Sequence, residues 1–167
     1  VVRVFFGGAL HPEAIERTRL RDVTYLELDN LRTVLDQAAL VVYSKDGDYE
    51  SLVRTSDELR PRIESCITRS PDLSLGHTLL GRVWEIQGWL EKAEAEWRRA
   101  IELDADAAAP RLALARLLLE TSYLASLTFG EISRMGPRPM GSGDAERQIQ
   151  GAIEAITRGK GIDAVQL

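Results

Sequence analysis

Histidine and cysteine, which often act as catalytic bases, nucleophiles or metal ligands, are few in this chain. The two histidines are His11, at an expected helix start, and His77, inside a helical segment, and neither belongs to a nucleophile-and-base pattern. Cys66 is the single cysteine, so an internal disulfide is impossible and no thiolate metal site can form within one chain. We therefore expect no catalytic residue, no metal site and no cofactor, and we interpret His77 as a packing residue.

Two short segments resemble ligand-binding loops but lack essential residues. Asp104-Ala105-Asp106 lacks the glycine and the distant glutamate of a calcium-binding loop. Gly141-Ser142-Gly143 lacks the lysine of a phosphate-binding loop and the context of an exposed-serine elbow. We interpret the first segment as solvated turn residues, and neither segment predicts a ligand.

The charge distribution argues against a nucleic-acid partner. The chain has a formal net charge of -5, and its 21 Lys and Arg residues are dispersed among 26 Asp and Glu residues. No block of five or six like charges is present, so long-range attraction to nucleic acid is not expected. Arginine outnumbers lysine, which favours bidentate anion recognition where guanidinium groups converge, although codon bias explains a chain-wide skew equally well.

The length and apolar content indicate one ordinary domain. With 167 residues and 44% hydrophobic content, the chain can bury a core without a disulfide or a metal. No stretch reaches the roughly 20 apolar residues of a membrane-spanning helix, so we expect a soluble protein. The compartment stays open between cytoplasm and periplasm, because the chain begins at Val1 and an upstream signal or anchor is compatible with that.

Helical periodicity dominates the chain, so the expected fold class is all-α. Residues 1–11 are expected to form an extended lead-in, and His11-Pro12-Glu13 marks a helix start. Residues 12–129 are expected to form a series of antiparallel helices. The glycine- and proline-rich residues 130–143 indicate a linker or loop. Residues 144–167 hold a last helix and a tail, and because a short helix is marginal alone, we expect it to dock on the body or on a partner.

The first helices carry clear apolar patterns. Asp29-Asn30 could interrupt the first helix, and in the second, residues 49–68, we expect a kink or restart near residues 56–60. The reason is that Pro61 lacks a backbone donor, while Ser56-Asp57 can cap a new helix. Further helices are expected over residues 73–87, 90–103 and 110–126. The residues expected to form the single buried stripe of the first helix are Ile15, Val23, Leu26, Leu31, Val34, Leu35, Ala38 and Val42.

Small and large residues alternate at fixed spacing between two neighbouring helices of the body. Leu80-Gly81 is followed after two positions by Trp84, and Ala93 is followed after three residues by Trp97. The glycine and the alanine allow two antiparallel helices to approach closely, while the tryptophans fill the space on either side. The pattern therefore predicts a tight helix pair, with Gly88 closing its first helix.

The pattern over residues 74–107 resembles a tetratricopeptide repeat (TPR), with His77 in place of the usual tryptophan. Matches in the flanking segments are weaker. Gly47 and Pro71 resemble the closing glycine and the terminal proline of a preceding repeat, but they are seven residues further apart than Gly88 and Ala105. The segment is therefore expected to be either an elongated second helix or a divergent cap. The resemblance implies a short TPR-like stack of antiparallel helix pairs, with a concave groove that binds peptides or neighbouring subunits.

The resemblance also places four candidate partner-binding residues on the wall of that groove. Arg82 and Arg116 lie 34 residues apart, at equivalent sites of successive first helices, and Thr78 and Leu112 lie one turn earlier. Two stacked guanidinium groups would clamp a carboxylate, favouring an acidic segment or a C-terminus. Alternatively, each arginine pairs with a glutamate three or four residues further along its own helix.

Trp89 is the other candidate partner-binding residue. The repeat pattern does not require an aromatic residue after Gly88, and an exposed tryptophan is a common interface anchor. Trp89 could equally pack under the upstream helix pair or the C-terminal segment. Leu124, Leu127 and Phe129 pose the same question, because they could cover the end of the stack or form an apolar patch for a partner.

Together these observations lead us to expect a non-catalytic scaffold or adaptor, or an accessory subunit of a larger assembly, that binds a protein or peptide. No cofactor, nucleic acid or membrane span is implied. The alternative is a regulatory or substrate-recruiting module of an enzyme whose catalytic domain lies outside this chain. The identity of the partner and the oligomeric state stay open.

Overall fold

The computed structural model describes residues 12–43, 48–129 and 142–158. They form α1 (Pro12–Tyr43), α2 (Tyr49–Arg69), α3 (Ser74–Ile86), α4 (Leu90–Leu103), α5 (Ala108–Phe129) and α6 (Ser142–Thr157). No strand occurs in these residues, so the predicted all-α fold is confirmed for them. The expected lead-in, residues 1–11, and residues 130–141 of the linker expected over 130–143 lie outside the described residues; residues 142 and 143 begin α6 instead.

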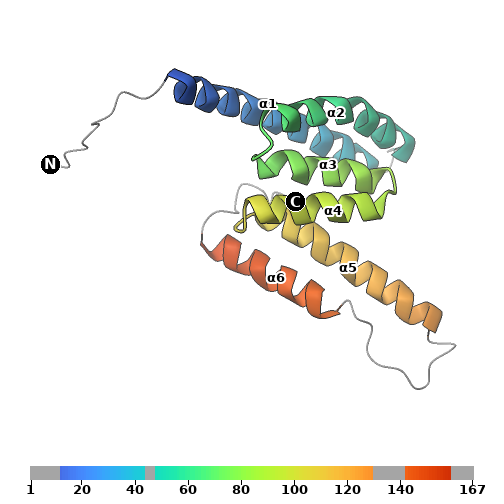
Figure 1. Ribbon diagram of the computed structural model, residues 1–167. Coiled ribbons are helices and arrows are strands. Elements are labelled where there is room, and N and C mark those ends of the chain that lie inside the picture. Colours follow the sequence, from blue (N-terminus) through green and yellow to red (C-terminus); the bar gives the residue numbers. More distant parts are fainter. Residues whose placement is uncertain (1–11, 44–47, 130–141, 159–167) are drawn as a thin grey trace.

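The helices form antiparallel pairs that stack side by side (Figure 1). α1 pairs with α2, α3 with α4, and α5 with α6, and the second helix of one pair also packs against the first helix of the next. α1 additionally contacts α3. The expected stack of antiparallel helix pairs is therefore what the described residues form.

Two clusters of buried side chains hold the stack together. The first joins α1, α2 and α3 and includes Leu31 and Ile63. The second joins α4 to α5 and includes Trp97 and Leu114. Trp84 of α3 packs against both clusters. The hydrophobic core is thus divided in two, and α3 connects its halves.

The α3–α4 pair is tight because Gly81 leaves room for Trp97. A methyl group added to Gly81 would lie 2.5 Å from Trp97 Nε1 and 2.6 Å from Trp97 Cδ1. The indole is 1% exposed, and its N–H donates to the Thr78 carbonyl oxygen at 3.3 Å. In the turn between the two helices, Gly88 has a φ of +80°, a left-handed conformation that favours glycine.

Positions 34 residues apart have equivalent surroundings in α2 and α4. The three buried residues of α4, Ala93, Trp97 and Ala100, are spaced by four and then three positions, and the last three of the five buried residues of α2, Leu59, Ile63 and Cys66, have the same spacing. In both helices, the carbonyl oxygen of the third residue accepts a 3.0 Å hydrogen bond from the N–H four residues later, at Ser70 and Asp104. α6 repeats the spacing at Ala145, Ile149 and Ala152, and both alanines are fully buried.

α1 buries a different stripe from the one expected. It is one uninterrupted helix through Asp29-Asn30, and its buried residues are Thr24, Leu28, Leu31, Leu35 and Ala39. Four members of the expected stripe are 44% to 62% exposed instead: Ile15, Val23, Leu26 and Val34. The prediction was wrong for these four because α1 has apolar residues on two faces, and the other helices cover only one of them.

α2 is a single helix of 21 residues, compared with 14 in α4. This length fits the first of the two alternatives for the segment, an elongated second helix. The restart expected near residues 56–60 is absent, because the helix continues through the exposed Pro61. Ser56 does not cap a new helix; its hydroxyl donates to the Val53 carbonyl oxygen at 2.7 Å.

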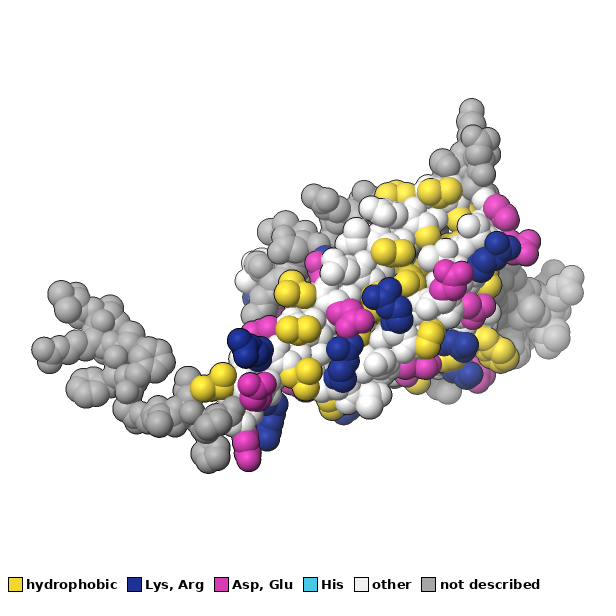
Figure 2. Space-filling view, turned by 90° about the horizontal axis from the view of Figure 1, so that it is seen from above, with side chains coloured by type: hydrophobic (Ala, Val, Ile, Leu, Met, Phe, Trp, Pro, Cys, Tyr) yellow, Lys and Arg dark blue, Asp and Glu magenta, His cyan; other side chains and the backbone are white. Residues whose placement is uncertain are grey.

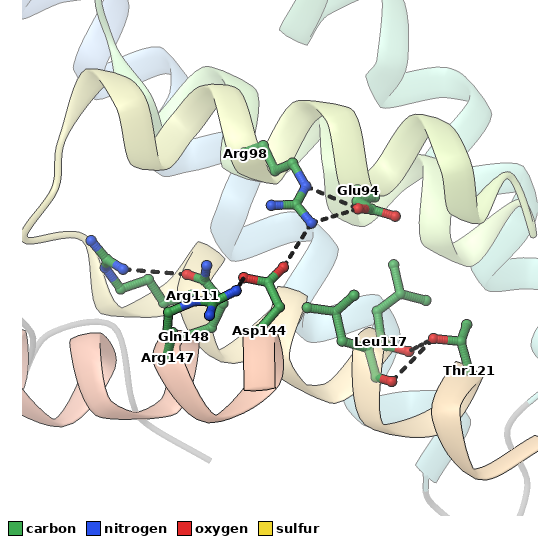
Figure 3. Close-up of polar contacts among 9 residues, drawn as sticks. Glu94, Arg98, Arg111, Leu117, Thr121, Asp144, Arg147 and Gln148 are labelled. Carbon is green, nitrogen blue, oxygen red and sulfur yellow. Dashed lines mark hydrogen bonds and ion pairs between the residues drawn. The ribbon is translucent and has the colours of Figure 1, made fainter. Parts of the chain in front are cut away.

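α6 packs on α5 and is tied to α4 by charged groups (Figure 3). Asp144, in the first turn of α6, accepts a hydrogen bond from Arg98 of α4 at 2.9 Å and one from Arg147 at 3.3 Å. The Arg98 guanidinium holds the pKa of Asp144 below its usual value. Arg111 of α5 donates to Gln148 of α6 at 3.3 Å. The last helix therefore docks on the body of the stack.

Candidate functional site

The two candidate arginines form ion pairs between successive first helices of the stack. Arg82 Nη1 of α3 contacts Asp36 Oδ1 of α1, and Arg116 Nη2 of α5 contacts Glu85 Oε1 of α3. These carboxylates belong to neighbouring helices, whereas the local alternative paired each arginine with its own helix. A carboxylate from a partner would have to displace Asp36 or Glu85 before it reached either guanidinium group.

The Arg116–Glu85 pair lies in a partly desolvated position. The Glu85 side chain is 23% exposed, compared with 54% for Arg116. Burial raises the pKa of Glu85, and the charge of Arg116 opposes that rise. Because burial is the larger of these effects, the fold disfavours the charged form of Glu85 despite its contact with Arg116.

Thr78 and Leu112 have different surroundings. The half-buried Thr78 donates its hydroxyl to the Ser74 carbonyl oxygen at 2.9 Å, and its own carbonyl oxygen accepts the Trp97 indole N–H. Leu112 is exposed on α5. Thr78 therefore supports the α3–α4 contact, while Leu112 presents an accessible side chain.

Trp89 lies at the edge of an open groove formed by α2 and the α3–α4 turn. The indole is 57% exposed, so within the described residues it does not pack under the upstream helix pair. We call this surface the Trp89 groove; its volume is about 460 Å³, and it is lined by Tyr49, Val53, Asp57, Arg60, Ile86, Gln87, Gly88 and Trp89.

Hydrogen bonds fix the walls of the Trp89 groove. The Tyr49 hydroxyl of α2 donates to the Ile86 carbonyl oxygen at 2.6 Å. The side-chain amide of Gln87 donates to Asp57 Oδ1 of α2 at 2.8 Å. Both bonds tie the α3–α4 turn to α2, so the shape of the groove is set before any partner arrives.

Two cations lie over the aromatic rings beside the groove. Lys92 Nζ is 4.4 Å from the ring centroid of Trp84 and 4.8 Å from that of Trp89. Arg60 Cζ is 5.2 Å from the Trp84 ring, and its guanidinium comes no closer than 3.9 Å to Asp57. Cation–π attraction holds both groups near the rings. The surface thus combines accessible aromatic area with positive charge, which suits an apolar side chain next to a carboxylate.

Sequence reasoning found Trp89 but missed its neighbours. Lys92 stands three residues after Trp89, a spacing that brings side chains together on a helix, so the sequence alone could have predicted this contact. Arg60 and Tyr49 come from α2. Periodicity along one helix carries no information about which residues of another helix will face it.

His77, Asp104 and Cys66 make contacts within the fold. His77 Nδ1 of α3 lies 2.7 Å from Glu96 Oε2 of α4, which links the two helices. Asp104 Oδ1 accepts the Asp106 N–H at 3.0 Å, closing the turn before α5. Cys66 is buried, and burial raises the pKa of its thiol. His11 lies outside the described residues.

The described residues show neither a metal site nor a membrane-spanning helix. They contain no group of three or more His, Cys, Asp or Glu side chains arranged to hold a metal ion. None of their helices combines the length and apolar character needed to cross a membrane. No protein-family model and no curated protein sequence matches the chain. The functional interpretation therefore depends on the residues and their geometry.

Proposed function

We propose that this chain is a non-catalytic scaffold or accessory subunit that binds a segment of another protein at the Trp89 groove. The observation that carries the proposal is the 57% exposed indole of Trp89 beside a groove whose walls are fixed by bonds from α2. An aromatic anchor in a preformed cleft is a typical centre of protein-binding energy. The partner segment would place an apolar side chain against Trp89 and a carboxylate near Lys92 and Arg60.

The recurrence between α2 and α4 supports a TPR-like interpretation of the stack. Buried triplets repeat at an interval of 34 residues, which is the length of a TPR unit. The close approach of Gly81 to Trp97 supports the same interpretation. Stacks of helix pairs expose extended surfaces that bind peptides and other subunits. We propose that role here.

The groups that would bind a partner carboxylate are Lys92 and Arg60 rather than Arg82 and Arg116. Asp36 and Glu85 already engage the two latter arginines, so a partner would have to break existing ion pairs there. In the described part of the chain, the close contacts of Lys92 are with aromatic rings. A carboxylate arriving at Lys92 therefore gains a new charge-assisted hydrogen bond without displacing another.

Quantitative capture experiments test this proposal. Immobilised wild-type protein and the variants Trp89→Ala and Lys92→Glu would be exposed to lysate of the source cells, and captured proteins measured by mass spectrometry. Ile153→Ala, which truncates an exposed residue of α6, is the matched control. We expect both groove variants to lose the same proteins and the control to retain them.

A peptide from the captured protein then gives the affinity. Truncation of a hot-spot tryptophan costs about 2 kcal/mol or more, so Trp89→Ala is expected to weaken peptide binding about 30-fold. Capture that neither groove variant changes would reject the site. Loss of capture only after Arg82→Glu and Arg116→Glu would place the binding surface at the ion pairs instead.

A further inference from the structure

α6 is the outer helix at one end of the stack, and it has a polar outer face. At the other end, Figure 2, seen from the side on which α1 and α2 lie in Figure 1, shows hydrophobic side chains among charged ones. On α6, by contrast, Ile153 is the single exposed large hydrophobic residue within the described residues. A polar outer face is typical of the helices that cap such stacks. α6 therefore covers its end of the stack as a cap.

The inner face of α6 buries little apolar surface. Its buried residues are small and its larger inner residues are half-buried: Ala145, Ala152 and Ala155, and Ile149 and Ile156. By contrast, α2 buries Ile63 and α4 buries Trp97. In the described part of the chain, neither buried cluster includes a residue of α6. Because hydrophobic stabilisation scales with the apolar area removed from water, α6 is held by less of it than α2 or α4.

Ion pairs fasten both ends of α6 to the body of the stack. At its start, Asp144 Oδ2 lies 2.9 Å from Arg98 Nη2 of α4 (Figure 3). Just after its end, Arg158 Nη1 lies 2.7 Å from Asp106 Oδ1, in the turn between α4 and α5. The Arg98 and Arg158 side chains are 44% and 59% exposed, so water and salt reach both pairs. Ion pairs in such positions weaken as the salt concentration rises.

Between the two ion pairs, α6 lies close to a guanidinium group of α5. Arg111 donates to the Ala105 carbonyl oxygen at 2.9 Å and to Gln148 of α6 at 3.3 Å. A methyl group added to Gly151 of α6 would lie 2.5 Å from Arg111 Nη1. Glycine in the interior of a helix lowers its stability. The helix therefore has a weak point where it meets Arg111.

We propose that α6 is a releasable cover, which detaches from α4 and α5 while α1 to α5 stay folded. An isolated helix of 16 residues is marginal, so α6 unfolds as it detaches. Detachment breaks the two exposed ion pairs, whereas the clusters that join α1 to α5 stay intact. It also removes Asp144 from Arg98 and Gln148 from Arg111. The device makes access to these two arginines dependent on ionic strength.

Hydrogen exchange of the whole chain, measured by mass spectrometry, tests the release. After correction for intrinsic rates, amides in the middle of α6 are expected to exchange at least about 10-fold faster than those of α3. Raising the NaCl concentration from about 0.05 M to about 0.5 M should speed exchange in α6 about threefold or more and change α3 less, because salt screens the two exposed ion pairs. Amides of α6 that are as slow as those of α3, or insensitive to salt, overturn the proposal.

A matched pair of variants on α4 tests the role of the fastening ion pair. Arg98→Gln removes the partner of Asp144 and leaves the sequence of α6 unchanged. Arg99→Gln is the control, because Arg99 pairs with Glu102 of its own helix at 2.8 Å. At low salt, Arg98→Gln should speed exchange in α6 about threefold or more, while Arg99→Gln should leave it at the wild-type rate. Equal rates in the two variants would overturn the assignment of Arg98 and with it the proposal.

Thiol labelling measures the release independently. Ala152→Cys in α6 and Ala100→Cys in α4 each place a thiol at a fully buried position. With the uncharged reagent N-ethylmaleimide, Ala152→Cys should react at least about 10-fold faster than Ala100→Cys. The parent protein, in which Cys66 is buried, gives the background rate. Similar rates at the two positions would mean that α6 opens only when the whole domain unfolds, which would overturn the proposal.

Discussion

Replacement of Gly81 by alanine tests the contact on which the α3–α4 pair depends. The added methyl group would lie 2.5 Å and 2.6 Å from two atoms of the Trp97 indole. That ring is rigid and almost fully buried, and its N–H is bonded to the Thr78 carbonyl oxygen. The ring cannot move aside without losing this bond, so the clash is relieved mainly by separating α3 from α4.

The expected size of the effect follows from two opposing contributions. Overpacking of a well-packed interior costs about 1–3 kcal/mol. Alanine gains about 1 kcal/mol over glycine inside a helix. Because the methyl group of Gly81→Ala meets a rigid ring, we take the upper part of the overpacking range. The net loss in the free energy of unfolding is then about 1–2 kcal/mol, which lowers the melting temperature by about 2–8 °C.

Urea unfolding followed by far-ultraviolet circular dichroism measures this loss. Gly143→Ala in α6 is the control, because nothing lies within 4 Å of its added methyl group; it should be neutral or slightly stabilising. In a Trp97→Leu background, which replaces the rigid ring by a smaller and flexible side chain, Gly81→Ala should cost at least about 0.5 kcal/mol less. A Gly81→Ala protein as stable as wild type, with no coupling to Trp97→Leu, would refute the reasoning.

Substitutions at three further positions have expected outcomes in the same unfolding assay. Gly88→Ala should lose about 1 kcal/mol, because its φ of +80° strains any residue with a Cβ, and Gly88→Asn should lose less. The pKa of Asp144 is lowered by Arg98, so this contribution to stability is complete above the ordinary carboxyl pKa and is lost as the pH falls below about 4. Asp144→Asn should therefore destabilise at pH 7 and reduce the acid sensitivity; an unchanged pH dependence would contradict the assignment. The pKa of Glu85 is raised by burial, so its contribution is complete at low pH and is lost as the pH rises through the raised pKa. Glu85→Gln should consequently gain stability relative to wild type between about pH 4 and pH 7, and a relative loss would show that the Arg116 pair dominates.

The sequence predicted contacts between consecutive helices best. Gly81 and Trp97 lie on two helices joined by one short turn, so their small and large side chains have few alternative partners. The elongated α2 was one of two open interpretations, and a helix of 21 residues fits it. The sequence predicted a kink or restart near Pro61, but α2 continues through this exposed residue without interruption.

Contacts between helices that are distant in the chain could not be predicted. Arg82 meets Asp36, which precedes it by 46 residues, while nearer carboxylates offered simpler partners. The buried face of α1 was undetermined for a related reason. Leu26 and Leu28 are equally hydrophobic, and only the positions of α2 and α3 decide that Leu28 is the one buried. The sequence also left open whether Trp89 is exposed, because its exposure depends on the position of α2.

The division of the hydrophobic interior at α3 has an evolutionary consequence. Trp84 is shared by the two clusters, so a change at this ring is felt by both halves of the molecule at once. A change in α1 or α5 alters one cluster and leaves the other largely intact, since the buried side chains of α1 belong to the first cluster and those of α5 to the second. Sequence drift should therefore be slowest around the middle of the chain and fastest toward its outer helices.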